Sequence, residues 1–143
     1  MYIQRKDNVP FFEGVNINDV INSCNTPFYL YSQKVITDTY NLLKDSLSSE
    51  IFFAVKANPN QAILKLMKNC GAGADVVSIG EIQRALNVGF HPNKIIFEGV
   101  GKSKKDIEYA VDKNIRLINV ESIGELELVN QIGKNFNKAI NIG

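Results

Sequence analysis

Ile95-Ile96-Phe97 and Leu117-Ile118-Asn119-Val120 are two nearly continuous apolar runs whose centres, Ile96 and Ile118, lie 22 residues apart. Continuous apolar runs of this length are typical of parallel strands that are buried on both faces. Three further runs repeat the pattern, so we expect strands at residues 51–55, 74–77, 94–97, 116–120 and 139–142. A period near 22 residues, with room for one helix in each period, predicts a repeated strand–helix unit.

Two of the stretches between these strands carry the apolar periodicity of helices that pack one face onto a sheet. Residues 62–70 and 79–86 each place apolar side chains at helical spacing, and Gly71 and Gly89 follow where the helices are expected to end. Glycine suits the left-handed conformation that commonly terminates a helix. Each of these periods is therefore expected to hold one helix.

Serines mark the beginning of the next two helices. Ser103 precedes Asp106 by three residues, and Ser122 precedes Glu125 by the same spacing. This is the pattern of a capping box, in which the serine and the acidic side chain satisfy free backbone N–H groups at a helix start. Apolar residues at helical spacing follow both serines, which supports helices at these two places.

The units predict an α/β fold that is the first part of a (β/α)8 barrel, with parallel strands alternating with helices. Residues 1–25 are expected to form a lead-in segment with turn signals and a brief helix near 17–21. The barrel portion is expected to span 26–143, beginning with a short strand at 28–31 and a helix that follows it. Five or so units do not close a barrel, and an open doubly wound sheet is the alternative, so we expect the chain to be the front part of something longer.

Composition excludes several classes of function. The 143 residues carry 16 Lys and Arg against 15 Asp and Glu, without a block of like charge, which argues against a nucleic-acid partner. No apolar run approaches the ~20 residues of a membrane span, and the first residues do not resemble a signal peptide. Cys24 and Cys70 lie far apart, which favours a reduced, cytoplasmic setting. One histidine, His91, leaves no cluster for a metal.

Lys56, in Phe52-Phe53-Ala54-Val55-Lys56-Ala57-Asn58, is the residue with the clearest chemical potential. It follows a buried apolar strand, at the end where barrel enzymes place their catalytic groups. Desolvation there would disfavour the ammonium form, and a neutral amine can attack a carbonyl to form a Schiff base. The alternative is a lysine at a strand end whose ammonium group extends into solvent, and position alone favours this alternative.

The stretch Gly71-Ala72-Gly73-Ala74-Asp75-Val76-Val77-Ser78 holds the next candidates. Its glycines suit a helix end and a tight turn, while Asp75 and Ser78 lie in and just after the strand. Ser78 is at least as well explained as the N-cap of the following helix, and Glu81 suits the first turn of that helix. Gly99-Val100-Gly101-Lys102-Ser103 matches only the last part of a phosphate-binding loop, since Ile96 stands where the pattern needs glycine.

Read together, these segments resemble the barrel domain of the diaminopimelate decarboxylases. The resemblance is carried, in order, by the stretches 26–31, 53–58, 71–81, 97–103 and 119–122, and it covers nearly the whole chain from about Phe11 to Gly143. Gly-Val-Gly-Lys after the third strand is most similar to the diaminopimelate branch. Ornithine- and arginine-type decarboxylases of the same barrel class share the lysine motif.

The resemblance implies an enzyme that uses pyridoxal 5'-phosphate to convert meso-2,6-diaminopimelate into L-lysine and CO2 in lysine biosynthesis. By the same resemblance, Lys56 is the catalytic lysine that holds the cofactor as a Schiff base, and Asp75 and Glu81 match acidic residues near the cofactor. Ser78 is added as a cofactor-binding candidate because of its placement. No metal is implied, and the full-length form is expected to be a homodimer with a C-terminal β domain that this chain lacks.

Several parts of the family pattern have no counterpart in the 143 residues. A histidine that stacks on the cofactor, a glycine-rich phosphate loop and an acidic partner of the pyridine nitrogen belong to later strands in this family. We therefore expect the chain alone to be an incomplete fragment with little or no decarboxylase activity. The alternatives are another pyridoxal enzyme of the same barrel class, of the ornithine or arginine type, or a non-catalytic pyridoxal-phosphate-binding fragment. Pro59-Asn60-Gln61 after the lysine motif disfavours an alanine racemase.

Overall fold

The structure, a computed structural model, describes residues 3–143. These residues form two compact units, one up to Ile36 and the other from Thr37 to Gly143. A domain boundary at residue 26 stays a prediction.

The first unit contains a three-stranded antiparallel sheet, which the sequence analysis did not anticipate. Its strands, in the order β1-β2-β3, are followed directly by a short helix: β1 (Ile3–Lys6), β2 (Val9–Phe12), β3 (Val15–Asn16) and α1 (Ile17–Ser23). Two-residue turns join the strands, and the turn residues Asp7, Asn8, Glu13 and Gly14 all have positive φ. Turns of this kind match the twist of a hairpin, so the turn signals in this segment belong to hairpins. The expected brief helix is confirmed as α1.

The strand expected at residues 28–31 is wrong. This segment has no regular secondary structure, no other segment of the described chain pairs with it in a ladder, and Tyr29 is 89% exposed. An apolar run becomes a strand only where a neighbour accepts its backbone hydrogen bonds. After it, the Ser32 hydroxyl accepts a hydrogen bond from the Val35 N–H at 3.0 Å, at the start of α2 (Gln33–Ser46).

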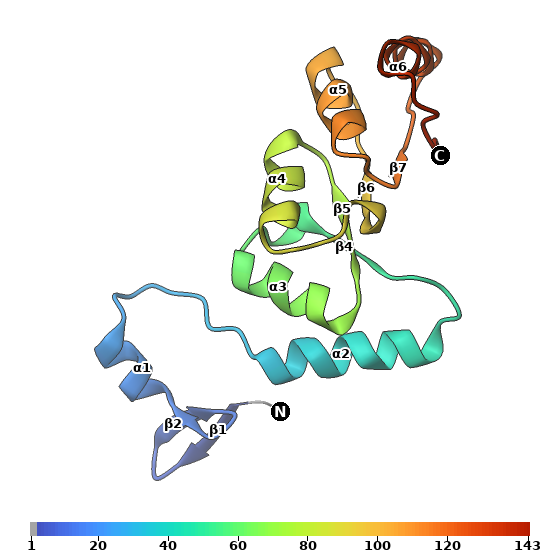
Figure 1. Cartoon of the computed structure of the whole chain (residues 1–143). Helices are drawn as coiled ribbons and strands as arrows, with labels where there is room; N and C mark the ends of the chain where they lie inside the picture. The colour runs from blue at the N-terminus through green and yellow to red at the C-terminus, as the bar shows by residue number, and fades with distance from the viewer. Residues whose placement is uncertain (1–2) are drawn as a thin grey trace. The chain divides into compact units, whose positions relative to one another are not determined.

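The second unit contains a four-stranded parallel sheet whose strands lie in chain order, β4-β5-β6-β7 (Figure 1). Strands alternate with helices throughout, which confirms the α/β class and the strand–helix repeat. The elements after α2 are β4 (Phe52–Ala54), the 3-10 turn η1 (Val55–Ala57), α3 (Gln61–Cys70), β5 (Gly73–Val76), α4 (Ile79–Asn87), the 3-10 turn η2 (Pro92–Lys94), β6 (Ile95–Phe97), α5 (Lys104–Asp112), β7 (Leu117–Ile118) and α6 (Ile123–Phe136).

The last expected strand, at 139–142, is present only as a parallel bridge between Ile118 and Ile142. Its parallel direction is as expected. The Ile118 N–H donates to the Asn141 carbonyl at 3.0 Å, and the Val120 N–H donates to that of Gly143 at 2.9 Å. The sheet remains open rather than closed into a barrel.

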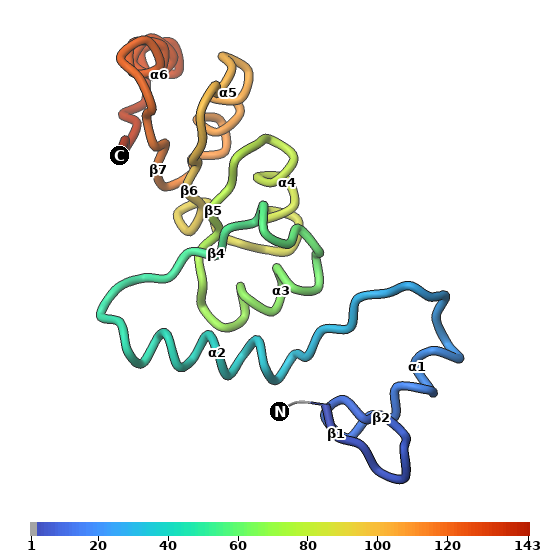
Figure 2. The backbone as a smooth tube through the Cα atoms, turned by 180° about the vertical axis from the view of Figure 1, so that it is seen from behind, coloured from blue at the N-terminus to red at the C-terminus, as the bar shows by residue number. Residues whose placement is uncertain are grey.

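Helices α3, α4 and α5 follow one another along the sheet, as the tube in Figure 2 also makes visible. Their caps form as the sequence predicts: Gly71 ends α3 in the left-handed conformation, and Ser103 with Asp106 forms a complete capping box at α5. Ser122 caps α6, accepting from the Glu125 N–H at 3.2 Å. The Glu125 carboxylate, however, does not return to the cap and is used elsewhere.

The two faces of the sheet differ in what covers them. On one face Ala74, Val76, Ile95, Phe97 and Ile118 are at most 1% exposed, because the helices pack over them to form the core. On the other face the residues alternate with these and are half-buried. That second face, and the carboxyl ends of its strands, carry the side chains described next.

Candidate active site

Lys56 lies where β4 gives way to a single 3-10 turn. The turn closes with a hydrogen bond from the Asn58 N–H to the Val55 carbonyl at 3.1 Å, while Val55 is fully buried and anchors the turn in the core. Lys56 itself is exposed. The location at the carboxyl end of a sheet strand is therefore as expected, but the described residues do not bury the amine as the sequence argument assumed.

Asp75 lies on the neighbouring strand β5, paired in register with Ala54 of β4. Its Oδ1 atom is buried and has no hydrogen-bond partner in the described part of the chain. Burial raises the pKa of the Asp75 carboxyl, the negative charges of Glu98 and Glu81 raise it further, and the positive charge of Lys56 lowers it. The structure thus brings Lys56 and Asp75 into electrostatic contact at one end of the sheet.

Ser78 and Glu81 build the start of α4. The Ser78 hydroxyl accepts from the Glu81 N–H at 3.3 Å, and the Glu81 carboxylate accepts from the Val77 N–H at 2.8 Å. These contacts confirm the N-cap interpretation of Ser78. The two residues follow β5 directly and lie near Asp75 in the chain, and their contact with a cofactor stays a prediction.

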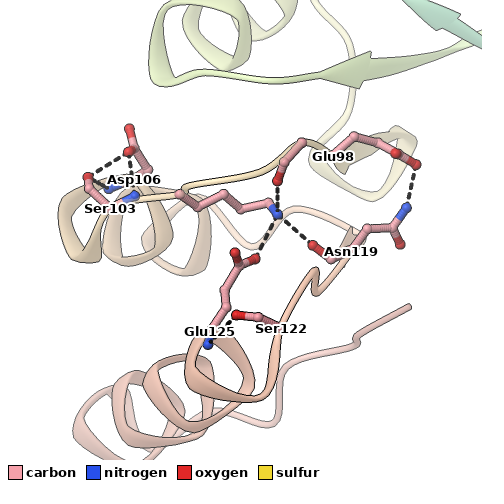
Figure 3. A network of polar contacts seen from close by, with 8 residues as sticks. Glu98, Ser103, Asp106, Asn119, Ser122 and Glu125 are labelled. Atoms are coloured by element: carbon pink, nitrogen blue, oxygen red, sulfur yellow. Dashed lines mark hydrogen bonds and ion pairs between the residues drawn. The ribbon is translucent and has the colours of Figure 1, made fainter.

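Glu98 and Asn119 were missed by the sequence analysis. Glu98 follows β6 and Asn119 follows β7, and the Asn119 side-chain amide donates to the Glu98 carboxylate (Figure 3). Neither residue stands in a motif that suggests such a contact. In the sequence, the two residues have in common only that each lies at or just beyond the end of an expected strand. That position predicts a contact between them only when the pairing register of β6 and β7 is known.

Lys102 and Glu125 form an ion pair in the same region, with Nζ and Oε1 2.7 Å apart and side chains only 2% and 7% exposed. The Lys102 ammonium also donates to the carbonyls of Gly99 at 2.5 Å and Asn119 at 2.6 Å. An ammonium group has three N–H donors, and all three have partners here. Buried charges are tolerated when they are paired and hydrogen-bonded in this way.

This pairing also decides how the glycine-rich stretch before Ser103 is used. In a phosphate loop the lysine must reach the ligand, whereas Lys102 is directed to protein acceptors. The stretch is a strand-to-helix loop with Gly99 and Gly101 at positive φ.

Other kinds of site find no support among residues 3–143. No three His, Cys, Asp or Glu side chains gather there in an arrangement that could hold a metal ion. None of the helices in that range has the length and apolar character to cross a membrane. Cys24 and Cys70 are free thiols.

Parallel strand–helix units with a lysine and a carboxyl group near the carboxyl ends of adjacent strands are typical of enzymes built on an α/β sheet. Comparison with known proteins identifies the family. The chain belongs to the family described as pyridoxal-dependent decarboxylase, pyridoxal binding domain, which matches residues 33–142. The cofactor of this family is pyridoxal phosphate, and its members are lyases.

The most similar relatives include the diaminopimelate decarboxylases of Aquifex aeolicus, 37% identical over 142 residues, and of Helicobacter pylori, 46% identical over 124 residues. These alignments cover 99% and 85% of this chain, but only 34% and 31% of the relatives. A crystal structure of the Helicobacter pylori enzyme complexed with L-lysine superposes with a TM-score of 0.85 at 40% identity, over 89% of this chain and 33% of that one. The chain thus spans about a third of the length of its relatives.

The residues present fit the cofactor of the family. Pyridoxal phosphate carries an aldehyde, for which the exposed primary amine of Lys56 is a suitable partner. The buried Asp75 oxygen without a partner lies on the adjacent strand, where a polar ligand could satisfy it.

Proposed function

We propose that the whole protein of which this chain forms a part decarboxylates meso-2,6-diaminopimelate to L-lysine and CO2. One observation carries the proposal: Lys56 lies in the turn that follows β4, and Asp75 on the adjacent strand β5 has a partnerless carboxyl oxygen, in a chain similar to diaminopimelate decarboxylases over almost its full length. In the reaction one Cα–carboxylate bond breaks, CO2 leaves, and a proton takes the place of the carboxylate on the same carbon.

Each residue has a role that follows from its chemistry. Pyridoxal phosphate, when bound, supplies the electron sink that takes up the pair released with CO2. Lys56 would hold the cofactor aldehyde through its amine and release it to the amine of the substrate. Asp75, with a buried oxygen that lacks a partner, is suited to form a hydrogen bond with a bound ligand. Glu81 and Ser78 keep the start of α4 in place next to it.

The test is reductive trapping on this chain. We expect that pyridoxal 5'-phosphate followed by borohydride modifies Lys56 ahead of the other twelve lysines, measured by peptide mass. Lys56→Arg should abolish the dominant product. Lys65→Arg, which removes another exposed lysine from the following helix α3, should leave it unchanged. Labelling spread evenly over surface lysines would contradict the proposal that Lys56 marks a cofactor site in this chain.

The substrate is tested on the full-length form. We expect CO2 release from meso-diaminopimelate to exceed release from ornithine and arginine, because the similarity over 99% of the chain is to a diaminopimelate decarboxylase. Preference for ornithine or arginine would assign the protein to the other branch of the same family and overturn the substrate proposed here.

We also propose that the whole protein is cytoplasmic and forms a homodimer. The free thiols of Cys24 and Cys70 support a reducing compartment. The dimer is supported by the resemblance to the family, and light scattering of the full-length form at several concentrations tests it. A monomer at every concentration would contradict it.

A further inference from the structure

We propose that Glu98 is a further positioning residue of this site, and that Asn119 together with the Lys102–Glu125 pair holds its carboxylate beside Asp75. This inference rests on the proposed function, because it assigns Glu98 to the same site as Lys56 and Asp75. None of the sequence motifs assigns a role to Glu98.

The register places Glu98 and Asp75 on the same face of the sheet. Asp75 pairs with Ile96 across β5 and β6, and Glu98 follows Ile96 by two residues. In a strand, residues two apart project to the same face, so Glu98 is the next side chain beyond Asp75 toward the carboxyl ends of the strands. The Glu98 N–H donates to the Val76 carbonyl at 2.8 Å, which fixes its backbone against β5.

Asn119 holds the other end of Glu98. Its side-chain amide donates to the Glu98 carboxylate, and its backbone N–H donates to the Phe97 carbonyl at 2.9 Å. The Asn119 carbonyl in turn accepts from the Lys102 ammonium, which is paired with Glu125 (Figure 3). A buried ion pair is costly to disrupt, so this chain of contacts limits where the Glu98 carboxylate can move.

The consequence for Asp75 is electrostatic. Three charged side chains act on it: Lys56 from the turn after β4, Glu81 from α4, and Glu98 from the end of β6. Burial is the largest cause of the raised pKa of Asp75, and Glu98 has the largest effect among the three charged side chains, in the same direction. A carboxylate fixed at this point disfavours the ionised form of Asp75 and so raises its pKa.

Glu98→Gln tests this, because glutamine keeps the shape and can still accept from Asn119 through its amide oxygen. The titration of Asp75 in this chain is followed by carboxyl carbon NMR, with Asp75→Asn identifying the signal. We expect Glu98→Gln to lower the midpoint of Asp75, because it removes a negative charge that raises the pKa of that carboxyl. Glu127→Gln, which removes an exposed carboxylate from α6, should leave the midpoint unchanged.

Asn119→Ala tests the holding contact while keeping the charge of Glu98. We expect a smaller decrease in the Asp75 midpoint, because a released carboxylate moves toward solvent. An unchanged midpoint in Glu98→Gln overturns the inference, and an unchanged midpoint in Asn119→Ala overturns the role of Asn119. Lys56 trapping in the unsubstituted chain is the independent check: its failure contradicts the proposed function, whereas labelled Lys56 with an insensitive Asp75 contradicts only the role of Glu98.

Discussion

Asp75 combines two properties that are unfavourable for stability. One of its carboxyl oxygens is buried without a hydrogen-bond partner, and two other carboxylates act on it through space. Unsatisfied buried polar groups are uncommon in folded proteins, and those that occur often belong to functional sites. This feature should therefore have a measurable cost for the stability of the chain.

We expect Asp75→Asn to stabilise the chain at neutral pH. The folded-state pKa of Asp75 is raised, so between its ordinary value of 3.8 and the raised value the folded state binds more protons than the unfolded state. Stability therefore falls as pH rises through this window, and above it the whole penalty is present. Removing the carboxylate should therefore raise the free energy of unfolding, measured with urea, more at about pH 7.5 than at about pH 3.5.

Asp112→Asn is the matched control. Asp112 is an exposed aspartate of α5 whose pKa is lowered, first by a hydrogen bond from Lys113, so its loss should reduce stability slightly at neutral pH. If Asp75→Asn and Asp112→Asn changed the stability in the same direction, Asp75 would not carry the penalty inferred for it.

Among the secondary-structure elements, sequence motifs predicted the features that depend only on residues close together in the chain. The caps at Ser103 and Ser122, the helix end at Gly71 and the spacing of the four strands are all determined by residues a few positions apart, and the structure confirms them. The strand at 28–31 failed because pairing depends on a partner that the segment itself does not specify. The hairpins of the first unit were not predicted because their strands are short, so that the two residues of each turn are the main indication of a hairpin.

In the candidate site, too, the sequence predicted the positions that depend on local pattern and missed the contacts between distant segments. Lys56 and Asp75 could be placed because each stands at or near the end of an apolar run, where the strand end alone determines the position. Glu98 with Asn119, and Lys102 with Glu125, are contacts between segments about 20 residues apart. Their pairing depends on register and on the side chains' directions, which periodicity does not provide. Glu125 even carried a misleading signal, because it suits a capping box.

Gly73, the first residue of β5, is needed for the packing of two strands. A Cβ atom there would overlap the ring of Phe52 on β4 and lie 2.8 Å from the Lys94 carbonyl oxygen. Gly73→Ala should therefore cost about 1–3 kcal/mol of unfolding free energy, measured by urea denaturation, which is the usual cost of overpacking. Gly124→Ala, in the helix α6 where nothing lies within 4 Å of the new atom, should instead stabilise by up to about 1 kcal/mol. Equal effects of the two substitutions would contradict this account.

In the second unit, Glu50 links the segments that precede β4, β6 and β7 at the amino end of the sheet. It stands just before β4 and contacts both Lys94, which precedes β6, and Arg116, which precedes β7. The Arg116 guanidinium also lies over the Phe52 ring, 5.3 Å from its centroid. All of these charges are partly exposed, so the cluster contributes modestly and is sensitive to salt.

The pH dependence of Glu50→Gln is the corresponding prediction. Hydrogen bonds from Lys94 and then Arg116 lower the pKa of Glu50, so its contribution to stability is present above the ordinary value of 4.5 and is lost as pH falls through the lowered value. The variant should have a slightly lower urea midpoint than the unsubstituted chain at about pH 7, with the two converging in acid and in ~1 M salt. Glu121→Gln, at another exposed glutamate, is the control. A difference that persisted unchanged in acid would contradict the prediction.

The sequential order of β4 to β7 has a consequence for how the sheet can assemble. Phe53 pairs with Ala74, Ala74 with Ile95, and Ile96 with Leu117, so every pairing closes a loop of 21 residues. Loop-closure entropy depends on loop length, and contacts between segments near in sequence favour rapid folding. Each strand therefore joins the growing sheet at nearly the same entropic cost, whichever neighbouring pair forms first.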